Sequence, residues 1–90
     1  MIIGKVVGNV WATRKDEALN GYKLLVVKPL DEYGERNIPT IVATDTIGAG
    51  IGDKVLVVKG SSARQALDRN NVPIDATIVG IIDEVDIEDD

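Results

Sequence analysis

Apolar and polar residues alternate along most of the chain, which is the pattern of half-buried β-strands. In residues 2–13, one face of the predicted strand carries Ile2, Gly4, Val6, Gly8, Val10 and Ala12. The glycines on that face predict tight curvature or close backbone approach, as in a small barrel. Four more strands are predicted, over 22–28, 38–44, 54–59 and 74–82, and residues 83–87 are a candidate extension of the last one.

Polar residues, glycines and prolines separate the strands. Loops are predicted over 14–20, 31–37 and 45–53. Pro29 is expected to end the second strand, because proline has no amide N–H to give to a ladder.

The periodicity changes in residues 60–67, which predict a short helix between the fourth and fifth strands. Ser62 and Gln65 have the spacing of a capping box at its start. Five strands and one short helix predict an all-β fold: a compact, partly open barrel of the OB type, with an SH3-like barrel or a small sandwich as the alternative. Residues 1–90 are expected to form a single domain with a flexible acidic end at 84–90.

The net charge of −5 is unevenly distributed. The last eight residues hold six acids and no base, so residues 1–82, with ten bases and nine acids, carry a balance of +1. A binder of phosphate backbones would show a clustered basic face, which neither part of the chain shows in its sequence.

The composition argues against catalysis and against metal or cofactor binding. The chain has no Cys and no His, which removes thiolate chemistry, disulfides and the commonest acid/base and transition-metal ligand. Adjacent acidic pairs such as Asp16-Glu17 point to opposite faces of an extended chain and predict solvated surface. No cofactor is expected. The absence of a secretory pattern and of a long apolar stretch favours a reduced cytoplasmic setting without membrane contact.

A glycine-rich run, Gly48-Ala49-Gly50-Ile51-Gly52, occupies the predicted loop 45–53. It lacks the Lys-Ser/Thr of a phosphate-binding loop, and a strand follows it rather than a helix. It therefore predicts a tight structural loop, in which glycines supply positive φ. A loop with few side chains also suits the packing of copies around a symmetry axis or the lining of a narrow pore.

Two charged residues lie beside small apolar neighbours and are candidates for pairing. These are Arg64, between Ala63 and Ala66, and Asp75, before Ala76. A charge in such surroundings is often paired, and both an intrachain and an intersubunit salt bridge are open. Helix capping explains Ser61 and Ser62 better than catalysis, since no His is available to activate a serine.

Nucleic-acid binding is the alternative function, because OB barrels often bind single strands. The residues in its favour are Trp11 with Arg14 and Lys15, and Tyr22 with Lys23. The other strands supply no further aromatic residue for stacking bases.

The order and spacing of several segments resemble the EutN/CcmL family, the pentameric vertex proteins of bacterial microcompartments and carboxysomes. The matching segments are Gly4 to Thr13 with Arg14-Lys15, Leu19 to Val27, Val42 to Gly50, Gly60 to Arg64, Pro73 to Ala76 and Ile78 to Asp83. The resemblance covers residues 2 to about 85, and the acidic end departs from it.

The resemblance implies an OB-type barrel that assembles into a five-membered ring. Such rings cap the corners of a cytoplasmic shell that hexameric proteins of another fold otherwise tile, so the implied partners are copies of the chain itself and those hexamers. It implies that the loop with Asp45, Gly48, Ala49 and Gly50 lies near the ring axis. The segment with Ser61, Ser62 and Arg64 would lie at a subunit boundary with Asp75, and Thr13, Arg14 and Lys15 are candidate contacts to shell partners.

Overall fold

The structure is a computed structural model of the chain and describes residues 1–12, 16–31, 34–35, 39–68 and 72–85. Its strands are β1 (Ile2–Asn9), β2 (Lys23–Asp31), β3 (Gly34–Glu35), β4 (Ile41–Asp45), β5 (Lys54–Lys59) and β6 (Ala76–Ile81). A 3₁₀ helix, η1 (Glu17–Leu19), precedes β2, and the helix α1 (Ser61–Ala66) connects β5 to β6.

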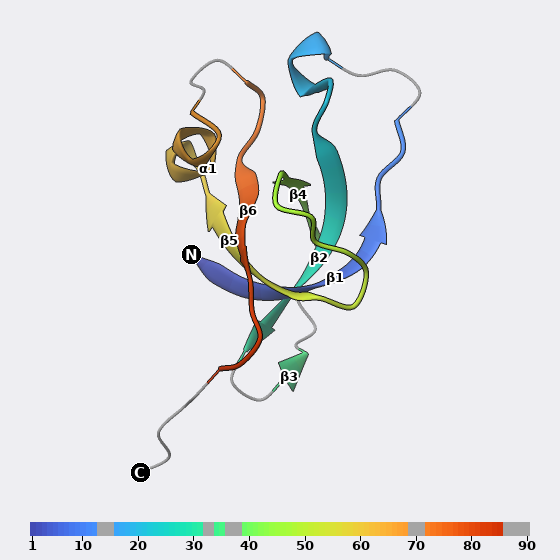
Figure 1. Cartoon of the computed structure of the whole chain (residues 1–90), viewed down its shortest axis with the longest axis vertical. Helices are drawn as coiled ribbons and strands as arrows, with labels where there is room; N and C mark the ends of the chain where they lie inside the picture. Colours follow the sequence, from blue (N-terminus) through green and yellow to red (C-terminus); the bar gives the residue numbers. More distant parts are fainter. Residues whose placement is uncertain (13–15, 32–33, 36–38, 69–71, 86–90) are drawn as a thin grey trace.

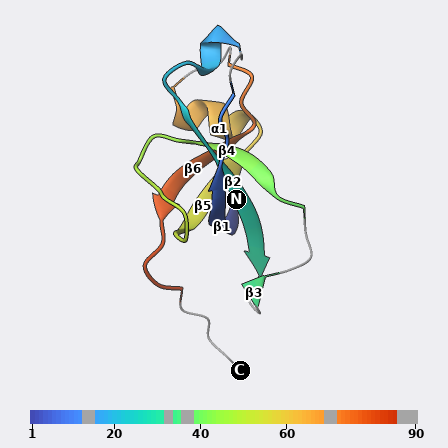
Figure 2. The same ribbon diagram turned by 90° about the vertical axis from the view of Figure 1, so that its right-hand side faces the viewer.

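Five strands close into a barrel, and the two-residue β3 only extends the far end of β2 (Figures 1 and 2). Around the barrel, β1 pairs with β5, β5 with β6, β6 with β4, β4 with β2, and β2 again with β1. These pairings are antiparallel except that of β4 with β6, which is parallel. The prediction of a five-stranded OB-like barrel with a short helix before its last strand is confirmed.

The barrel is closed, so the expectation of a partly open one is wrong. The closing pairing is short: Thr44 lies opposite Thr77, and Asp45 opposite Ile78. A buried polar network reinforces it, because the Thr44 and Thr77 hydroxyls are 3.0 Å apart and the Thr77 hydroxyl donates to the carbonyl of Ala63 at 3.0 Å. In this way α1 is tied to the two strands that complete the barrel.

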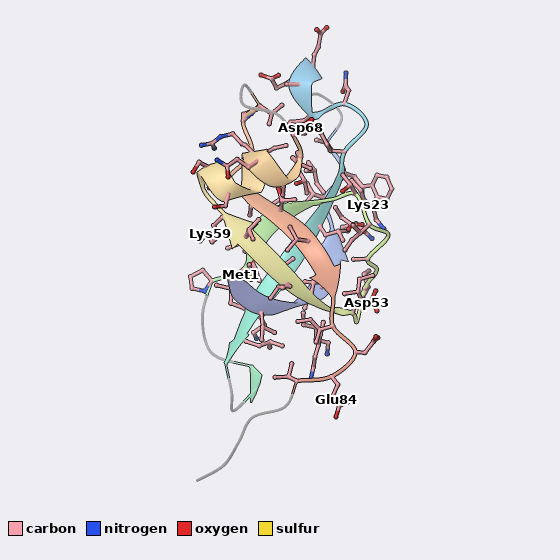
Figure 3. All side chains as sticks on the ribbon, turned by 60° about the vertical axis from the view of Figure 1, so that its left-hand side comes forward. Met1, Lys23, Asp53, Lys59, Asp68 and Glu84 are labelled. Atoms are coloured by element: carbon pink, nitrogen blue, oxygen red, sulfur yellow. The ribbon has the colours of Figure 1, made fainter. Side chains whose placement is uncertain are left out.

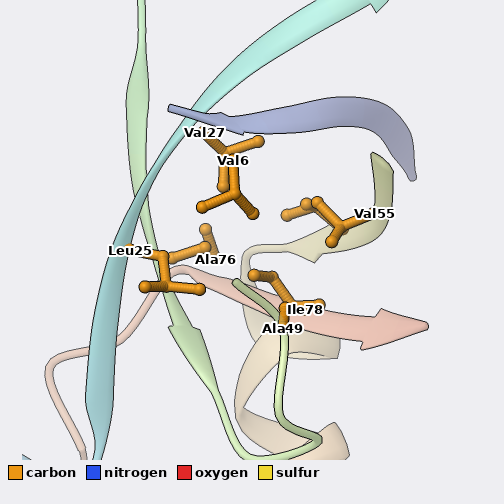
Figure 4. Close-up of a cluster of buried hydrophobic side chains, with 9 residues drawn as sticks. Val6, Leu25, Val27, Ala49, Val55, Ala76 and Ile78 are labelled. Carbon is orange, nitrogen blue, oxygen red and sulfur yellow. The ribbon is translucent and has the colours of Figure 1, made fainter. Parts of the chain in front are cut away.

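Aliphatic side chains from all five strands fill the interior (Figure 4). The loop between β4 and β5 adds Ala49, so that loop closes over the core. The cluster consists of Val6, Leu25, Val27, Ala43, Ala49, Val55, Val57, Ala76 and Ile78. β2, β5 and β6 each contribute two alternate residues to this cluster, as the sequence pattern predicted.

Gly4 is the position at which the barrel depends on a missing side chain. A Cβ built on Gly4 would collide with Cγ1 of Val27 and lie 3.1 Å from the carbonyl oxygen of Lys28. The prediction that a glycine of the first strand permits close backbone approach therefore holds at this residue.

A second, smaller cluster lies under α1. Ala63, Val72 and Ile74 are its buried members, and partly buried side chains from η1, β5 and the ends of β2 and α1 pack against them. The helix therefore covers part of the barrel surface near β5 and β6, as Figures 1 and 2 show.

Several boundary predictions differ from the structure, among them the starts of the third and last strands, which begin at Ile41 and Ala76 instead of at 38 and 74. The first strand ends at Asn9 instead of continuing to 13. The segment 14–20, predicted as a loop, contains η1. The Asp16 carboxylate caps the first turn of η1 by accepting a hydrogen bond from the amide of Ala18 at 2.8 Å. Pro29 does not end β2: it lies opposite Gly4, and the strand continues into the hairpin with β3. Proline can remain in a ladder because opposite residues alternate between hydrogen-bonded and non-hydrogen-bonded pairs. The extension of the last strand is also wrong for its described part, because 83–85 are not strand.

The capping box predicted for Ser62 and Gln65 is wrong as well. The N-cap is Gly60, so Ser62 already lies inside the helix, and no side chain caps its first turn. The backbone explains this start of the helix. Gly60 has a φ of 64°, a conformation that favours glycine, and its amide donates a hydrogen bond to the carbonyl of Asp75 at 2.8 Å.

Candidate subunit interface

One buried carboxylate organises the loop after β4. Asp45 is 4% exposed, and its Oδ1 accepts a hydrogen bond from the amide of Ile47 at 3.2 Å. Its Oδ2 accepts from the amides of Gly48 and Ala49 at 3.1 and 2.9 Å. Hydrogen bonds to an ionised acceptor are stronger than neutral ones, so this side chain fixes the direction in which the chain leaves the barrel.

The far end of the same loop is held by three more contacts. The Asp53 carboxylate accepts from the amide of Gly50 at 2.9 Å, and the Lys23 ammonium donates to the carbonyl of Ala49 at 2.7 Å. The amide of Gly52 donates to the carbonyl of Val6 at 2.9 Å. The structure therefore contains the predicted tight loop. Its hydrogen bonds attach it to β1, β2 and β4.

The four residues predicted near the ring axis do not share one environment. Asp45 and Ala49 are buried, Gly50 is half-buried, and Gly48 is exposed with a φ of 91°. The apolar surface of the loop comes instead from Ile47 and Ile51, which are 44% and 65% exposed. Of the predicted set, Asp45 and Ala49 shape the loop, and Gly48 is the one on its surface.

The structure brings together the four residues predicted at a subunit boundary. Ser61, Ser62 and Arg64 lie on α1, and Asp75 lies beside Gly60 through the hydrogen bond from the Gly60 amide. Within the described part of the chain, Arg64 and Asp75 form no ion pair, and the Arg64 Nη1 donates to the carbonyl of Ile74 at 2.9 Å. Of the two alternatives left open, the intrachain pair between these two residues is not present, and Asp75 presents an exposed carboxylate.

Among the residues that the structure describes, no group of His, Cys, Asp and Glu is arranged to hold a metal ion. The described helices also include none that is long and apolar enough to cross a membrane. Thr13, Arg14 and Lys15, the predicted contacts to shell partners, lie outside the described residues.

The family model described as "Ethanolamine utilisation protein EutN/carboxysome" matches residues 1–83. This chain belongs to the EutN/CcmL family. The resemblance stated from the sequence is thereby confirmed, and the match includes the loop after β4, α1 and all of the barrel strands.

Relatives in the EutN/CcmL family are similar over nearly their whole length. The bacterial microcompartment shell vertex protein GrpN of Rhodospirillum rubrum is 49% identical over 86 residues, which are 96% of this chain and 97% of GrpN. The carboxysome shell vertex protein CcmL of Synechococcus elongatus is 44% identical over 88 residues, which are 98% of this chain and 89% of CcmL.

Solved structures of the family have the same fold. The structure of Gloeobacter violaceus CcmL superposes with a TM-score of 0.90 at 39% identity and covers 98% of this chain and 91% of that one. The GrpN pentameric microcompartment shell protein from Rhodospirillum rubrum superposes with a TM-score of 0.86 at 46% identity, covering 99% and 100%.

Apart from Trp11, which the nucleic-acid alternative named, the exposed apolar side chains of this EutN/CcmL domain were not predicted as a site. Trp11 is 89% exposed, and Val42 on β4 and Ile81 on β6 are 49% and 42% exposed. The sequence carried a signal for them, because several strands are apolar on both faces. That signal alone cannot separate a surface that contacts another subunit from one that is covered within the chain.

Proposed function

We propose that this chain is a structural shell protein that forms a pentameric ring and caps the vertices of a bacterial microcompartment. The observation that carries this function is family membership over residues 1–83, with relatives named as shell vertex proteins. A solved relative that covers 99% of this chain is a pentameric shell protein. Microcompartments lie in the cytoplasm, which is where the chain acts.

The family and its named relatives are structural proteins and not enzymes, which confirms the prediction of a non-catalytic function. The same relatives favour the shell function over the nucleic-acid-binding alternative. The alternative required Trp11 for stacking bases. In a shell protein, the exposed Trp11 side chain instead provides apolar surface for contact with another protein.

A ring requires two different surfaces on each subunit, because a head-to-tail interface joins one patch to another. The outer side chains of a closed barrel must supply these patches. We assign one region of contact to the surface of the loop 46–53 and another to Ser61, Ser62, Arg64 and Asp75. The rigid hydrogen bonding of both regions supports this assignment, since surfaces that are already ordered lose less entropy on association.

A flat sheet of hexagonal tiles cannot close into a shell, so the proposed ring supplies the corners. We assign the contact with hexameric shell proteins to the segment Thr13, Arg14 and Lys15. Its two adjacent bases and the neighbouring exposed Trp11 are chemically suited to a protein surface with acidic and apolar groups.

Co-production with hexameric shell proteins tests this function. Electron microscopy is expected to show closed shells with this chain at their corners, and shells lacking those corners when the chain is omitted. The double variant Arg14→Glu and Lys15→Glu is expected to keep the ring but to leave the corners open. Glu84→Lys, a charge reversal at an exposed residue outside the assigned contact regions, is the control that is expected to cap normally. A chain that forms no ring and never enters shells would contradict the function. A double variant that caps normally would contradict only the assigned contact.

A further inference from the structure

One asparagine of the chain is followed by glycine, and it lies in an exposed turn. The pair Asn20-Gly21 joins η1 to β2, and both residues are exposed to solvent. Figure 3 shows η1 and its connection to β2 at the end of the molecule where α1 also lies. The remaining asparagines precede valine, isoleucine or another asparagine in the sequence: Asn9, Asn37, Asn70 and Asn71.

The backbone of this pair forms a tight turn. Asn20 has a φ of −63° and a ψ of 135°, and Gly21 has a φ of 88°, as in a type II turn. The amide of Tyr22 closes the turn by donating to the carbonyl of Leu19 at 3.2 Å. Among the hydrogen bonds of the described residues, none has the Gly21 amide as its donor. The nitrogen of Gly21 is therefore not held by a hydrogen bond.

Asn9 shows that exposure alone does not make an asparagine reactive. It is exposed as well, but it lies in β1, and the amide of the next residue, Val10, donates to the carbonyl of Leu24 at 2.9 Å. The branched Cβ of Val10 also crowds the approach of its nitrogen to a neighbouring side chain, whereas glycine has no Cβ. Two features that protect Asn9 are thus missing at Asn20.

The Gly21 nitrogen must rotate towards the Asn20 side chain before it can attack. This rotation is a flip of the peptide plane between the two residues, of the kind that converts a type II turn into a type I turn. Gly21 is free to take either sign of φ, and the hydrogen bond that closes the turn is compatible with both turn types. Because the two groups belong to neighbouring residues, no further partner has to be brought into position.

We propose that Asn20 is a site of spontaneous deamidation in the native protein. Water or hydroxide removes the proton of the Gly21 amide, and the nitrogen attacks Cγ of Asn20. The new N–Cγ bond forms as the bond from Cγ to the side-chain nitrogen breaks, and that nitrogen takes up a proton and leaves as ammonia. Water then opens the resulting succinimide. Opening at Cγ gives aspartate at position 20, and opening at the main-chain carbonyl gives isoaspartate. No oxidation or reduction occurs.

The two products differ in their effect on the fold. Aspartate adds only a charge, whereas isoaspartate also lengthens the main chain by an extra carbon within the turn. Leu19 and Tyr22, on either side of the turn, pack with Ala18 against the buried cluster under α1. A longer turn changes the spacing of these side chains and of the hydrogen bond between Leu19 and Tyr22, so η1 is expected to loosen. The proposal does not depend on formation of the ring.

Peptide mapping by mass spectrometry tests the site in the intact native protein during incubation at mildly alkaline pH. Both aspartate and isoaspartate are expected at position 20, at a rate many-fold higher than any conversion of Asn9. Higher pH is expected to speed the reaction, because the attacking amide must lose its proton. In water enriched in heavy oxygen, each product is expected to take up one heavy oxygen atom. Conversion only after unfolding in urea, or aspartate formed without isoaspartate, would overturn the proposal.

Thermal unfolding tests the effect on the turn. Asn20→Asp is the matched variant, since it carries the charge of the product without the longer main chain, and its midpoint is expected to stay unchanged. The purified isoaspartate form is expected to unfold at a lower temperature. Equal midpoints for the isoaspartate form and Asn20→Asp would overturn the effect on η1. Asn20→Ser removes the side-chain amide, so isoaspartate that still forms at the same rate in this variant would overturn the assignment to Asn20.

Discussion

Asp45→Ala is expected to destabilise the chain by about 2–4 kcal/mol, because it removes the buried carboxylate that accepts hydrogen bonds from three amides of the loop. The carboxylate is 4% exposed and accepts from Ile47, Gly48 and Ala49. Without it, the amide of Ala49, which is buried, loses its acceptor. Chemical denaturation followed by circular dichroism measures the free energy of unfolding. The ring is expected to weaken with it, since this loop is one of the assigned contact regions.

Asp53→Ala is the matched control at the other end of the same loop. It removes one carboxylate hydrogen bond, to the amide of Gly50, from a half-buried position. The expected loss is about 1 kcal/mol, the usual net worth of a single hydrogen bond. An Asp45→Ala protein as stable as the Asp53→Ala protein would show that the carboxylate of Asp45 does not organise the loop.

Gly4→Ala is the second substitution with a large expected effect, of about 1–3 kcal/mol, which is the usual cost of overpacking a core. The added methyl would collide with Val27, whose side chain is fully buried in the core. The carbonyl oxygen of Lys28, 3.1 Å away, belongs to the backbone of β2 and cannot rotate aside. The loss is expected as a lower midpoint of thermal unfolding.

Gly8→Ala offers a control on the same strand. A Cβ at Gly8 would meet side-chain atoms of Val26 at 3.7 and 3.8 Å, which is ordinary contact. Its stability is expected to stay within about 0.5 kcal/mol of the original, as for most surface changes. Equal losses for the two substitutions would contradict the close approach of β1 and β2 at Gly4.

The strands could be predicted because alternation reports directly which residues face a core. The fourth predicted strand, 54–59, has the bounds of β5, and its inward residues Val55 and Val57 are fully buried. Closure of the barrel could not be predicted in the same way. It depends on a two-residue parallel pairing and on the hydroxyl contact between Thr44 and Thr77, residues more than thirty positions apart.

Boundaries failed where tertiary contacts override local rules. Pro29 was expected to stop β2, yet pairing with Gly4 keeps the strand in the sheet. Ser62 has the composition of a cap, but the bond from the Gly60 amide to the carbonyl of Asp75 sets the start of α1 two residues earlier.

The candidate site was predictable only in part. Gly60 and Asp75, fifteen residues apart, are joined by a hydrogen bond and share one region of the surface, whereas Arg64 donates to the carbonyl of Ile74 and forms no ion pair with Asp75. The roles assigned to individual residues in ring and shell contacts stay predictions.

The mass of the purified protein in native mass spectrometry tests the central claim, assembly into a five-membered ring, most directly. The predicted species has five times the chain mass of 9.6 kDa, or about 48 kDa, in a sharp distribution without bound nucleic acid. A species at 9.6 kDa at micromolar concentration, or a ladder of open-ended oligomers, would contradict the account.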